Sequence, residues 1–357
     1  MNAPATPHVA RARLKIDMHR VGEQSFLHNA ASGALVAAEL PMAAHVAVAE
    51  ALAHGKLGAA DLPEYWIDAG LALTAPPAFV CPVPYTAPCG AVHDVFQFAD
   101  RSVCLRSEDP LLSRDIRAAL SNLISETDQP PSICIDVVRS SDGYGVFHNE
   151  TAVWGRAPFD LSRFHVLREV MIGLFGPHRL AASLHGSAIE IRGRAVLFVG
   201  PSGAGKTTLS LGLVAGGARL VADDHIALET SGTSVLAYPC KSELKPSAKH
   251  LPHLDGLANA EAGARSDAVL LDVPHAAPGT SLPIAALVFP RFEAGGDNHT
   301  SHLEPADVLH RLYHSGGRLI PGQSLGPLVD LVTQVPCLSL SFRDTEYSLS
   351  QCQGLVS

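Results

Sequence analysis

The sequence is poor in charged and in aromatic side chains: 17% of its 357 residues are charged and 6% are aromatic, whereas 47% are apolar. A chain this rich in apolar residues is too apolar to be intrinsically disordered, and its length allows more than one domain. Positive charge is in deficit, because 26 basic residues stand against 35 acidic ones and the formal net charge is −9. We therefore expect neither nucleic acid nor a membrane surface as a partner.

Cysteine pairs and long apolar runs are also missing. The seven cysteines lie far apart, form no CxxC pair and have no zinc-finger spacing. This pattern predicts reduced thiols with a structural role. No run of about 18 uncharged apolar residues occurs, and the basic amino-terminal stretch lacks the apolar segment of a secretory signal. The sequence therefore predicts a cytoplasmic protein.

Histidine is abundant, with 18 residues, yet no metal-ligand pattern emerges. His250 with His253, and His299 near His302, are the closest pairs, and neither has a third ligand at helical spacing. We interpret them as solvated loop histidines.

Proline marks the clearest domain boundary. Five prolines lie between Pro76 and Pro88, and each one restricts its own backbone and that of the residue before it. Together with a change of pattern near residue 165, this predicts three domains, over residues 1–85, 86–165 and 166–357.

The first domain is predicted to be a small α+β module. A hairpin is expected over residues 26–40, with its turn near Gly33. An alanine-rich helix is expected over 42–55, and a second helix over 61–73 with Asp61 as its N-cap.

The second domain shows short strands and one amphipathic helix, a pattern typical of another α+β unit. We expect strands over 94–99, 102–106, 133–138 and 145–149, and a helix over 115–126. From residue 164 onward, apolar segments alternate with turns and helices, which indicates a larger α/β core.

The most informative segment is GPSGAGKT, over residues 200–207. It follows a buried strand over 195–199 and precedes a helix that starts near Lys206 and ends at Gly216. Glycine lets the loop fold its amides around a phosphate at the positive end of the helix dipole. In such a loop the lysine contacts the β- and γ-phosphates and the hydroxyl of Thr207 ligates Mg²⁺. The alternative is a glycine-rich turn that binds nothing.

Two adjacent carboxylates, Asp223 and Asp224, follow the next predicted strand. Neighbours on a strand point to opposite faces, so the two share a site only if the strand ends there. One of them can then hold Mg²⁺ while the other faces an attacking hydroxyl as a general base. The alternative is an acidic surface turn.

His185 lies 15 residues before Gly200, on a strand or turn that can form a hairpin with residues 194–199. This pairing would bring the imidazole near the two carboxylates. Spacing alone does not distinguish a catalytic histidine from a structural one.

The ordered set of His185-Gly186, the GPSGAGKT loop and the Ala222-Asp223-Asp224 segment resembles the HPr kinase/phosphorylase family, and more closely its divergent HprK-related kinases. The resemblance covers roughly residues 165 to 345 and is specific from His185 to Glu229. It implies an α/β fold in which a P-loop kinase core, like that of phosphoenolpyruvate carboxykinase, follows the small α+β domains. It also implies ATP and Mg²⁺ as cofactors and transfer of phosphate to a serine hydroxyl.

The resemblance assigns roles to residues of this chain. The nucleotide phosphates would be bound by Gly200, Ser202, Gly203, Ala204, Gly205, Lys206, Thr207 and Thr208. The metal would be held by Thr207 and Asp223. The catalytic group would be His185, Asp223, Asp224 and Lys206, with Asp224 as the base.

The chain departs from the family in its carboxyl-terminal segment 316–325, which only faintly matches the family's loop. Phosphorolysis, and HPr as the acceptor, are therefore outside what the resemblance implies. Arg291 and Arg318 are candidate transition-state cations or, equally, structural surface residues. Lys245 is either a phosphate-binding cation or a solvated loop charge.

Residues 1–85 faintly resemble the PqqD-like module of peptide-modification systems, in which a leader peptide adds a strand to a sheet edge. The leading interpretation is thus a kinase for a serine-type hydroxyl of a peptide or protein, such as a precursor peptide. The alternatives are a kinase for a small molecule and a non-catalytic, nucleotide-gated binding module. The sequence also allows a homo-oligomer.

Overall fold

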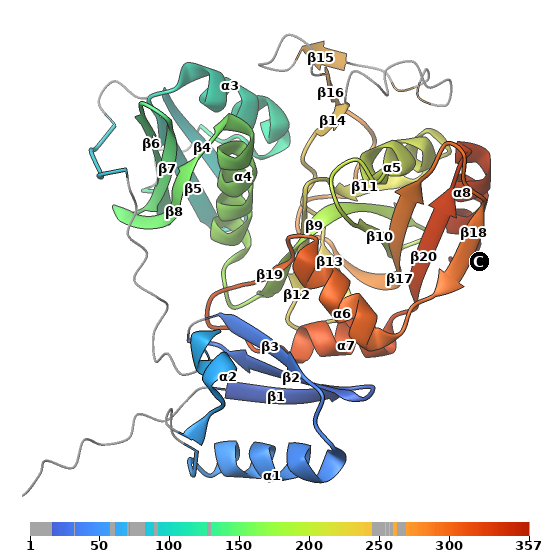
Figure 1. Cartoon of the computed structure of the whole chain (residues 1–357). Coiled ribbons are helices and arrows are strands. Elements are labelled where there is room, and N and C mark those ends of the chain that lie inside the picture. Colours follow the sequence, from blue (N-terminus) through green and yellow to red (C-terminus); the bar gives the residue numbers. More distant parts are fainter. Residues whose placement is uncertain are drawn as a thin grey trace, which may run out of the picture. The chain divides into compact units, whose positions relative to one another are not determined.

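The computed structural model describes residues 16–31, 33–57, 61–69, 71, 83–88, 92–126, 130–244, 254, 257, 260–262 and 269–356 (Figure 1). The chain divides into two compact units, one of residues 1–78 with 321–325 and one of residues 79–320 with 326–357. Helices and mixed sheets confirm the α/β class. The division into three domains stays a prediction, and much of the proline-rich segment lies outside the described residues.

The first unit is a three-stranded antiparallel sheet with two helices. Its elements are β1 (Ile16–Val21), β2 (Gln24–Asn29), β3 (Ala34–Ala38), α1 (Met42–Ala53) and α2 (Glu64–Asp68). Strands β2 and β3 form the predicted hairpin, and Gly33 adopts a positive φ of 75° in its turn. The unit has a core of its own, which includes Leu27, Leu52 and Trp66.

The predicted second helix of this unit is wrong in its bounds. Asp61 is not its N-cap, because the helix begins at Glu64 after Pro63, whose ψ of 143° is extended. Proline also disfavours helical backbone in the residue before it, so the helix cannot reach back to Asp61. It ends at Asp68 instead of residue 73.

The second unit contains a five-stranded sheet in the order β4-β5-β6-β7-β8. Its strands are β4 (Val92–Phe98), β5 (Arg101–Ser107), β6 (Ile133–Ser140), β7 (Gly143–His148) and β8 (Thr151–Ala157). Strands β5 and β6 are parallel, and between them in the chain lie helix α3 (Pro110–Ala119) and the short 3-10 helix η2 (Ser121–Leu123).

Helix α3 starts and ends earlier than the predicted range of 115–126. The reason is its N-cap: the Asp109 carboxylate accepts hydrogen bonds from the amides of Leu111 at 2.8 Å and Leu112 at 3.2 Å. A proline at the first helical position, Pro110, fits the same start.

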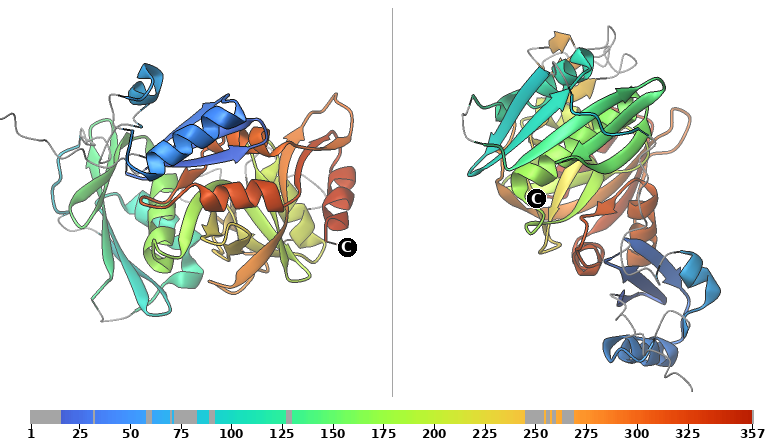
Figure 2. Two further views of the ribbon diagram at one scale, coloured as in Figure 1. Left: turned by 90° about the horizontal axis from the view of Figure 1, so that it is seen from below. Right: turned by 90° about the vertical axis from the view of Figure 1, so that its left-hand side faces the viewer.

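Helix α4 (Phe159–Phe175) lies between the five-stranded sheet and the larger sheet of this unit (Figures 1 and 2). Its buried side chains share one hydrophobic cluster with both sides, through residues such as Ile135 and Leu180. In addition, the Tyr238 hydroxyl donates to the carbonyl oxygen of Leu167 at 3.1 Å. This helix therefore connects the two sheets through a common core.

The larger sheet has nine strands, and a small three-stranded sheet is formed by the segment between two of them, β13 and β17. The nine are β9 (Leu180–Ile191), β10 (Arg194–Val199), β11 (Arg219–Ala222), β12 (His225–Glu229), β13 (Ser234–Leu236), β17 (Ser281–Phe292), β18 (His299–His302), β19 (Arg318–Leu319) and β20 (Cys337–Phe342). The three are β14 (Ser242–Leu244), β15 (Ala260–Ala262) and β16 (Val269–Leu271). The accompanying helices are α5 (Lys206–Ala215), α6 (Pro305–His314), α7 (Gly326–Gln334) and α8 (Thr345–Gly354).

The directions of four strands in this sheet place their carboxyl ends at one edge. Strand β17 runs parallel to β10 and to β20. Strand β9 is antiparallel to both β10 and β11, so β11 runs in the same direction as β10. The carboxyl ends of β11, β10, β17 and β20 therefore face the same side, which is the edge where open α/β sheets usually carry their ligand sites.

Within the described part of the chain, no helix is long and apolar enough to cross a membrane. The five cysteines in that part are free thiols: Cys104, Cys134, Cys240, Cys337 and Cys352.

Candidate active site

The predicted phosphate loop joins β10 to α5 at the common edge. Strand β10 is buried from Ala195 to Val199, and α5 begins at Lys206. Two loop glycines adopt left-handed backbone, with φ of 86° at Gly203 and 97° at Gly205. A Cβ atom on Gly205 would also lie 3.1 Å from the ring of Phe342. The left-handed turn therefore favours glycine at position 205, and the ring leaves little room for a Cβ atom there.

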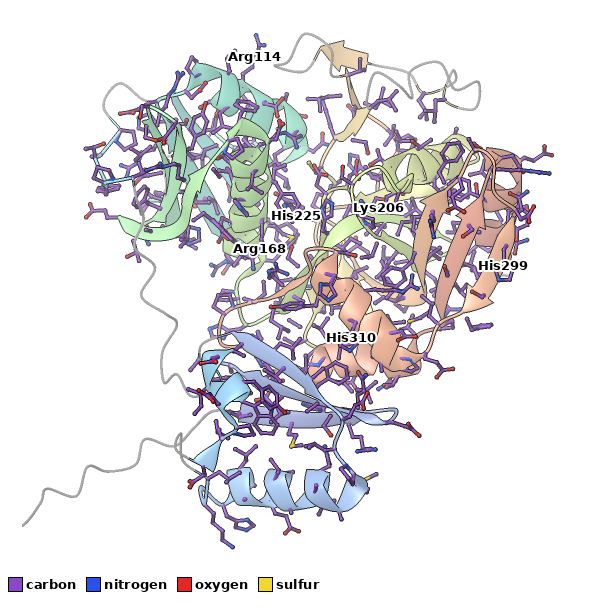
Figure 3. The ribbon with its side chains drawn as sticks, viewed as in Figure 1. Arg114, Arg168, Lys206, His225, His299 and His310 are labelled. Atoms are coloured by element: carbon purple, nitrogen blue, oxygen red, sulfur yellow. The ribbon has the colours of Figure 1, made fainter. Side chains whose placement is uncertain are left out.

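Lys206 is buried at the start of α5 (Figure 3). Its ammonium donates to the carbonyl oxygens of Gly200 at 2.8 Å and Pro201 at 3.0 Å, so the loop holds it in place. The backbone amides at the helix start and the dipole of α5 add positive potential at the same point. This part of the site is suited to bind an anion such as a phosphate.

The two acids fill the link between strands. Strand β11 ends at Ala222 and β12 begins at His225, so Asp223 and Asp224 lie in the two-residue turn. Asp224 has a φ of 64°, a left-handed conformation that is uncommon for residues other than glycine and that concentrates at functional sites.

Their environments differ. Asp223 is 5% exposed, and its Oδ1 accepts hydrogen bonds at 3.2 Å from the Thr207 hydroxyl and from the Asp224 amide. The side chain of Asp224 is 33% exposed. Asp223 is thus the acid hydrogen-bonded to the phosphate loop, and Asp224 is the more exposed of the two.

The same difference separates their proton affinities. Burial, and then the charge of Asp224, raise the pKa of Asp223 well above its usual range. Burial, the largest single influence, acts to raise the pKa of Asp224 as well, but the charge and hydrogen bond of Arg163, together with the neighbouring His225 and His185, outweigh it, so that pKa lies below its ordinary value. At neutral pH Asp224 carries the negative charge, and Asp223 retains a proton more readily than an ordinary carboxylate.

Arg163, which the sequence analysis missed, is the partner of Asp224. Its Nη1 lies 3.1 Å from Asp224 Oδ2, and its Nε is paired with the buried Asp115 of α3. One signal could have indicated it: Arg163 shares a helical face with Val166, Leu167 and Val170, which are all buried. An arginine on an apolar face needs a buried partner.

His185 lies beside the acids, as its spacing predicts. On β9 it is the register partner of His225, and the next amide, that of Gly186, donates to the Asp224 carbonyl oxygen at 3.2 Å. A Cβ atom on Gly186 would lie 2.2 Å from the carbonyl oxygen of Phe198. Glycine at position 186 therefore allows β9 and β10 to approach each other where the histidine is placed.

His225 anchors the turn through both nitrogens of its ring. Its Nε2 lies 2.7 Å from the Phe164 carbonyl oxygen of α4 and its Nδ1 lies 3.1 Å from the Ser183 hydroxyl (Figure 3). Burial lowers its pKa to about 3, so the ring is neutral, donates from Nε2 and accepts at Nδ1. The acid turn is thereby fixed to α4.

Other predicted cations and ligands lie elsewhere. Arg318 donates to the carbonyl oxygens of Tyr313 and Gly317, and Arg291 is exposed at the end of β17, 2.7 Å from Glu293. His299 and His302 are exposed on β18, the last strand in the order of the sheet (Figure 3). Lys245, His250 and His253 lie outside the described residues. In the described segments, no three His, Cys, Asp or Glu side chains converge as a metal site.

The oxygen atoms of Thr207 and Asp223 fit a magnesium ion that is bound together with a nucleotide. Mg²⁺ takes hard oxygen ligands and is commonly held by one or two carboxylates plus substrate phosphates and water. A hydroxyl and a buried carboxylate 3.2 Å apart, beside the phosphate loop, supply the protein's share of such a set.

Known proteins match this region of the chain. Residues 178–248 match the family model of the HPr Serine kinase C-terminal domain. The HPr kinase/phosphorylase of Aromatoleum aromaticum is 30% identical over 123 residues, 34% of this chain and 36% of that protein. That of Lactobacillus acidophilus is 52% identical over 44 residues, 12% of this chain and 14% of that protein. The chain thus spans between about a seventh and about a third of these relatives.

A solved structure, of the Hpr(Ser) kinase/phosphatase from Coxiella burnetii, matches with 14% identity and a TM-score of 0.27, covering 49% of this chain and 97% of that one. This likeness is too low to define the fold, which rests on the strand order of the chain itself. The matching family segment contains both the phosphate loop and the acid pair. The chain is therefore similar to HPr kinase/phosphorylases through the segment that forms its candidate active site.

Proposed function

We propose that this protein is an ATP- and Mg²⁺-dependent kinase that transfers the γ-phosphate to a serine-type hydroxyl of a peptide or protein. One observation carries the proposal: the phosphate loop and the acid pair share one sheet edge and are joined by the hydrogen bond from Thr207 to Asp223, at 3.2 Å. A protein that only binds nucleotide has no need for two carboxylates at that position.

The loop amides and Lys206 bind the phosphates, and Thr207 with Asp223 would hold the metal. When bound, Mg²⁺ neutralises charge on the phosphates and orients the terminal one. The raised pKa of Asp223 fits this role, because a metal ion is the positive partner that its buried carboxylate needs.

Asp224 accepts the proton of the acceptor hydroxyl. A bond forms between that oxygen and the γ-phosphorus, the bond from the γ-phosphorus to the bridging oxygen breaks, and ADP leaves. Because the pKa of Asp224 is lowered, the carboxylate is ionised at neutral pH and is ready to accept a hydrogen bond. In phosphoryl transfer, positioning contributes more than the strength of the base, so a weak base in the right place suffices. Arg163 and His185 are the positioning residues.

The acceptor class rests on the first unit. Its sheet has β1 and β3 as edge strands in the order β1-β2-β3. An edge strand can pair with an extended peptide through its main-chain groups. We propose that residues 1–85 form a peptide-recognition module, that residues 86–165 form the amino-terminal domain of the kinase and that residues 166–357 form its P-loop domain.

The test is transfer of label from γ-labelled ATP to candidate acceptors. We expect a labelled serine on a peptide or protein, and loss of this transfer in Asp224→Asn with ATP binding retained. Asp142→Asn, in an exposed turn, is the matched control and should act like wild type. Labelling of a metabolite instead would indicate a small-molecule kinase, and nucleotide binding with neither transfer nor hydrolysis would indicate a non-catalytic module.

A further inference from the structure

A large aromatic side chain is exposed beside the phosphate loop. Phe292, the last residue of β17, is 51% exposed. Its register partner on β20 is Phe342, which is buried, and the two ring centroids are 5.7 Å apart with a tilt of 60° between the planes. An exposed phenylalanine is costly to solvate, and here it is backed by a second ring that limits its movement.

The strand order places this aromatic pair opposite the acids. From one side to the other, the sheet runs β11, β9, β10, β17, β20. The acid pair follows β11, the phosphate loop follows β10, and the two phenylalanines end β17 and β20. All of these strand ends lie at the same edge, so the loop stands between the acids and the aromatic pair (Figure 1).

Contacts with the loop confirm this order at the level of atoms. A Cβ atom on Gly205 would lie 3.1 Å from the Phe342 ring and 3.8 Å from the Phe292 Cβ. Two residues further on, the Thr207 hydroxyl contacts Asp223. The start of α5 therefore touches the aromatic pair on one side and the metal-binding acid on the other. A nucleotide with its terminal phosphate at the acid side directs its opposite end toward the phenylalanines.

We propose that Phe292, supported by Phe342, is the stacking face for the nucleobase of the bound nucleotide. This inference rests on the proposed function, because it takes the phosphate position from the loop. The base of a nucleoside triphosphate is the part of the ligand that lies beyond the phosphates, and its flat π-face matches an exposed ring. Stacking requires no particular pattern of donors and acceptors, so Phe292 contributes affinity for the base as a class.

The test measures the contribution of the base to binding affinity separately from that of the phosphates. Calorimetric titrations of the full chain, with Mg²⁺ present, compare ATP with inorganic tripolyphosphate, which has the phosphate chain and no base. We expect Phe292→Ala to weaken ATP binding by about 5- to 140-fold, the range of a lost base–aromatic stack, and to leave tripolyphosphate binding unchanged. Phe292→Trp, which keeps an aromatic face, should restore ATP affinity.

Leu111→Ala is the matched control, because Leu111 is also 51% exposed and lies in α3. It should change neither titration. If Phe292→Ala weakens ATP and tripolyphosphate equally, Phe292 only supports the loop and the inference is wrong. If wild-type protein binds ATP and tripolyphosphate equally well, the phosphate site is supported and the stacking of the base on Phe292 is refuted. If neither ligand binds folded wild-type protein, the proposed function itself fails.

Discussion

Arg163→Met is the substitution whose effect the structure specifies in most detail. Arg163 supplies the positive charge for two acids, Asp115, whose side chain is 7% exposed, and Asp224, whose side chain is 33% exposed. Methionine keeps much of the side-chain length and removes the charge. Loss of one partner of a buried ion pair costs about 3–5 kcal/mol, because the remaining charge has no compensation. We therefore expect a loss of that size at pH 7.5.

The loss should depend on pH in a defined direction. In wild type the lowered pKa of Asp224 means that its pairing stabilises the fold above the ordinary aspartate pKa of 3.8 and is lost as the pH falls through the lowered value. In the variant, burial is no longer opposed by Arg163, so the pKa of Asp224 rises and the carboxyl takes up a proton at a higher pH than in wild type. The difference from wild type should therefore shrink between pH 7.5 and pH 5.

Urea unfolding measures both effects. With an m value of about 2 kcal/mol/M, the expected loss moves the midpoint by roughly 1.5–2.5 M. Arg156→Met is the control: its ion pair with Asp142 is 2.5 Å long but exposed, and such pairs contribute about 0–1 kcal/mol. The role of Arg163 in compensating the charges of Asp115 and Asp224 would be refuted if the Arg163→Met midpoint matched that of the control. It would also be refuted if the midpoint shift were the same at both pH values.

Three further predictions concern neighbouring residues. Asp223→Asn should weaken Mg-nucleotide binding and abolish the proton release that accompanies it, because the raised pKa of Asp223 makes Mg²⁺ displace a proton. Calorimetry in buffers of different ionisation enthalpy measures the number of protons released. An unchanged proton release in the variant would argue against a metal-binding role for Asp223. His185→Ala should slow phosphate transfer about 10- to 100-fold at unchanged ATP affinity, and a loss confined to affinity would exclude a positioning role. Gly186→Ala should lower the free energy of unfolding in urea by about 1–3 kcal/mol, because its Cβ would lie 2.2 Å from a backbone oxygen. Gly295→Ala, where a Cβ would meet no atom within 4 Å, should leave it unchanged. Equal unfolding midpoints for the two variants would contradict the close approach of β9 and β10 at Gly186.

Local signals in the sequence were sufficient for the central elements of the site. The strand, the loop glycines and the helix at Lys206 are neighbours in the chain, and their order predicts the geometry that the structure has. The hairpin that carries His185 was predictable for the same reason, because β9 and β10 are separated by a two-residue turn.

Contacts between residues far apart in the chain could not be predicted from the sequence. Arg163 reaches Asp224 across 61 residues of chain, and Phe292 and Phe342 meet through the parallel pairing of β17 with β20. No local pattern identifies either partner: the apolar face of α4 singles out Arg163 but does not show which acid it pairs with. The helix bounds failed for a different reason: at Pro63 and Asp109 a single residue fixes the start of a helix, while apolar periodicity extends over a wider range.

The proposed kinase activity requires that a nucleoside triphosphate binds at the start of α5. Calorimetric titration of Mg-ATP into the full chain tests this most directly, with Lys206→Ala, whose buried ammonium is removed, as the comparison. We predict saturable binding at one site per chain in wild type and its loss in a variant that remains folded. Nucleotide binding at the phosphate loop would be contradicted if folded wild-type protein gave no binding heat with Mg-ATP. It would also be contradicted if the Lys206→Ala variant bound Mg-ATP as tightly as wild type.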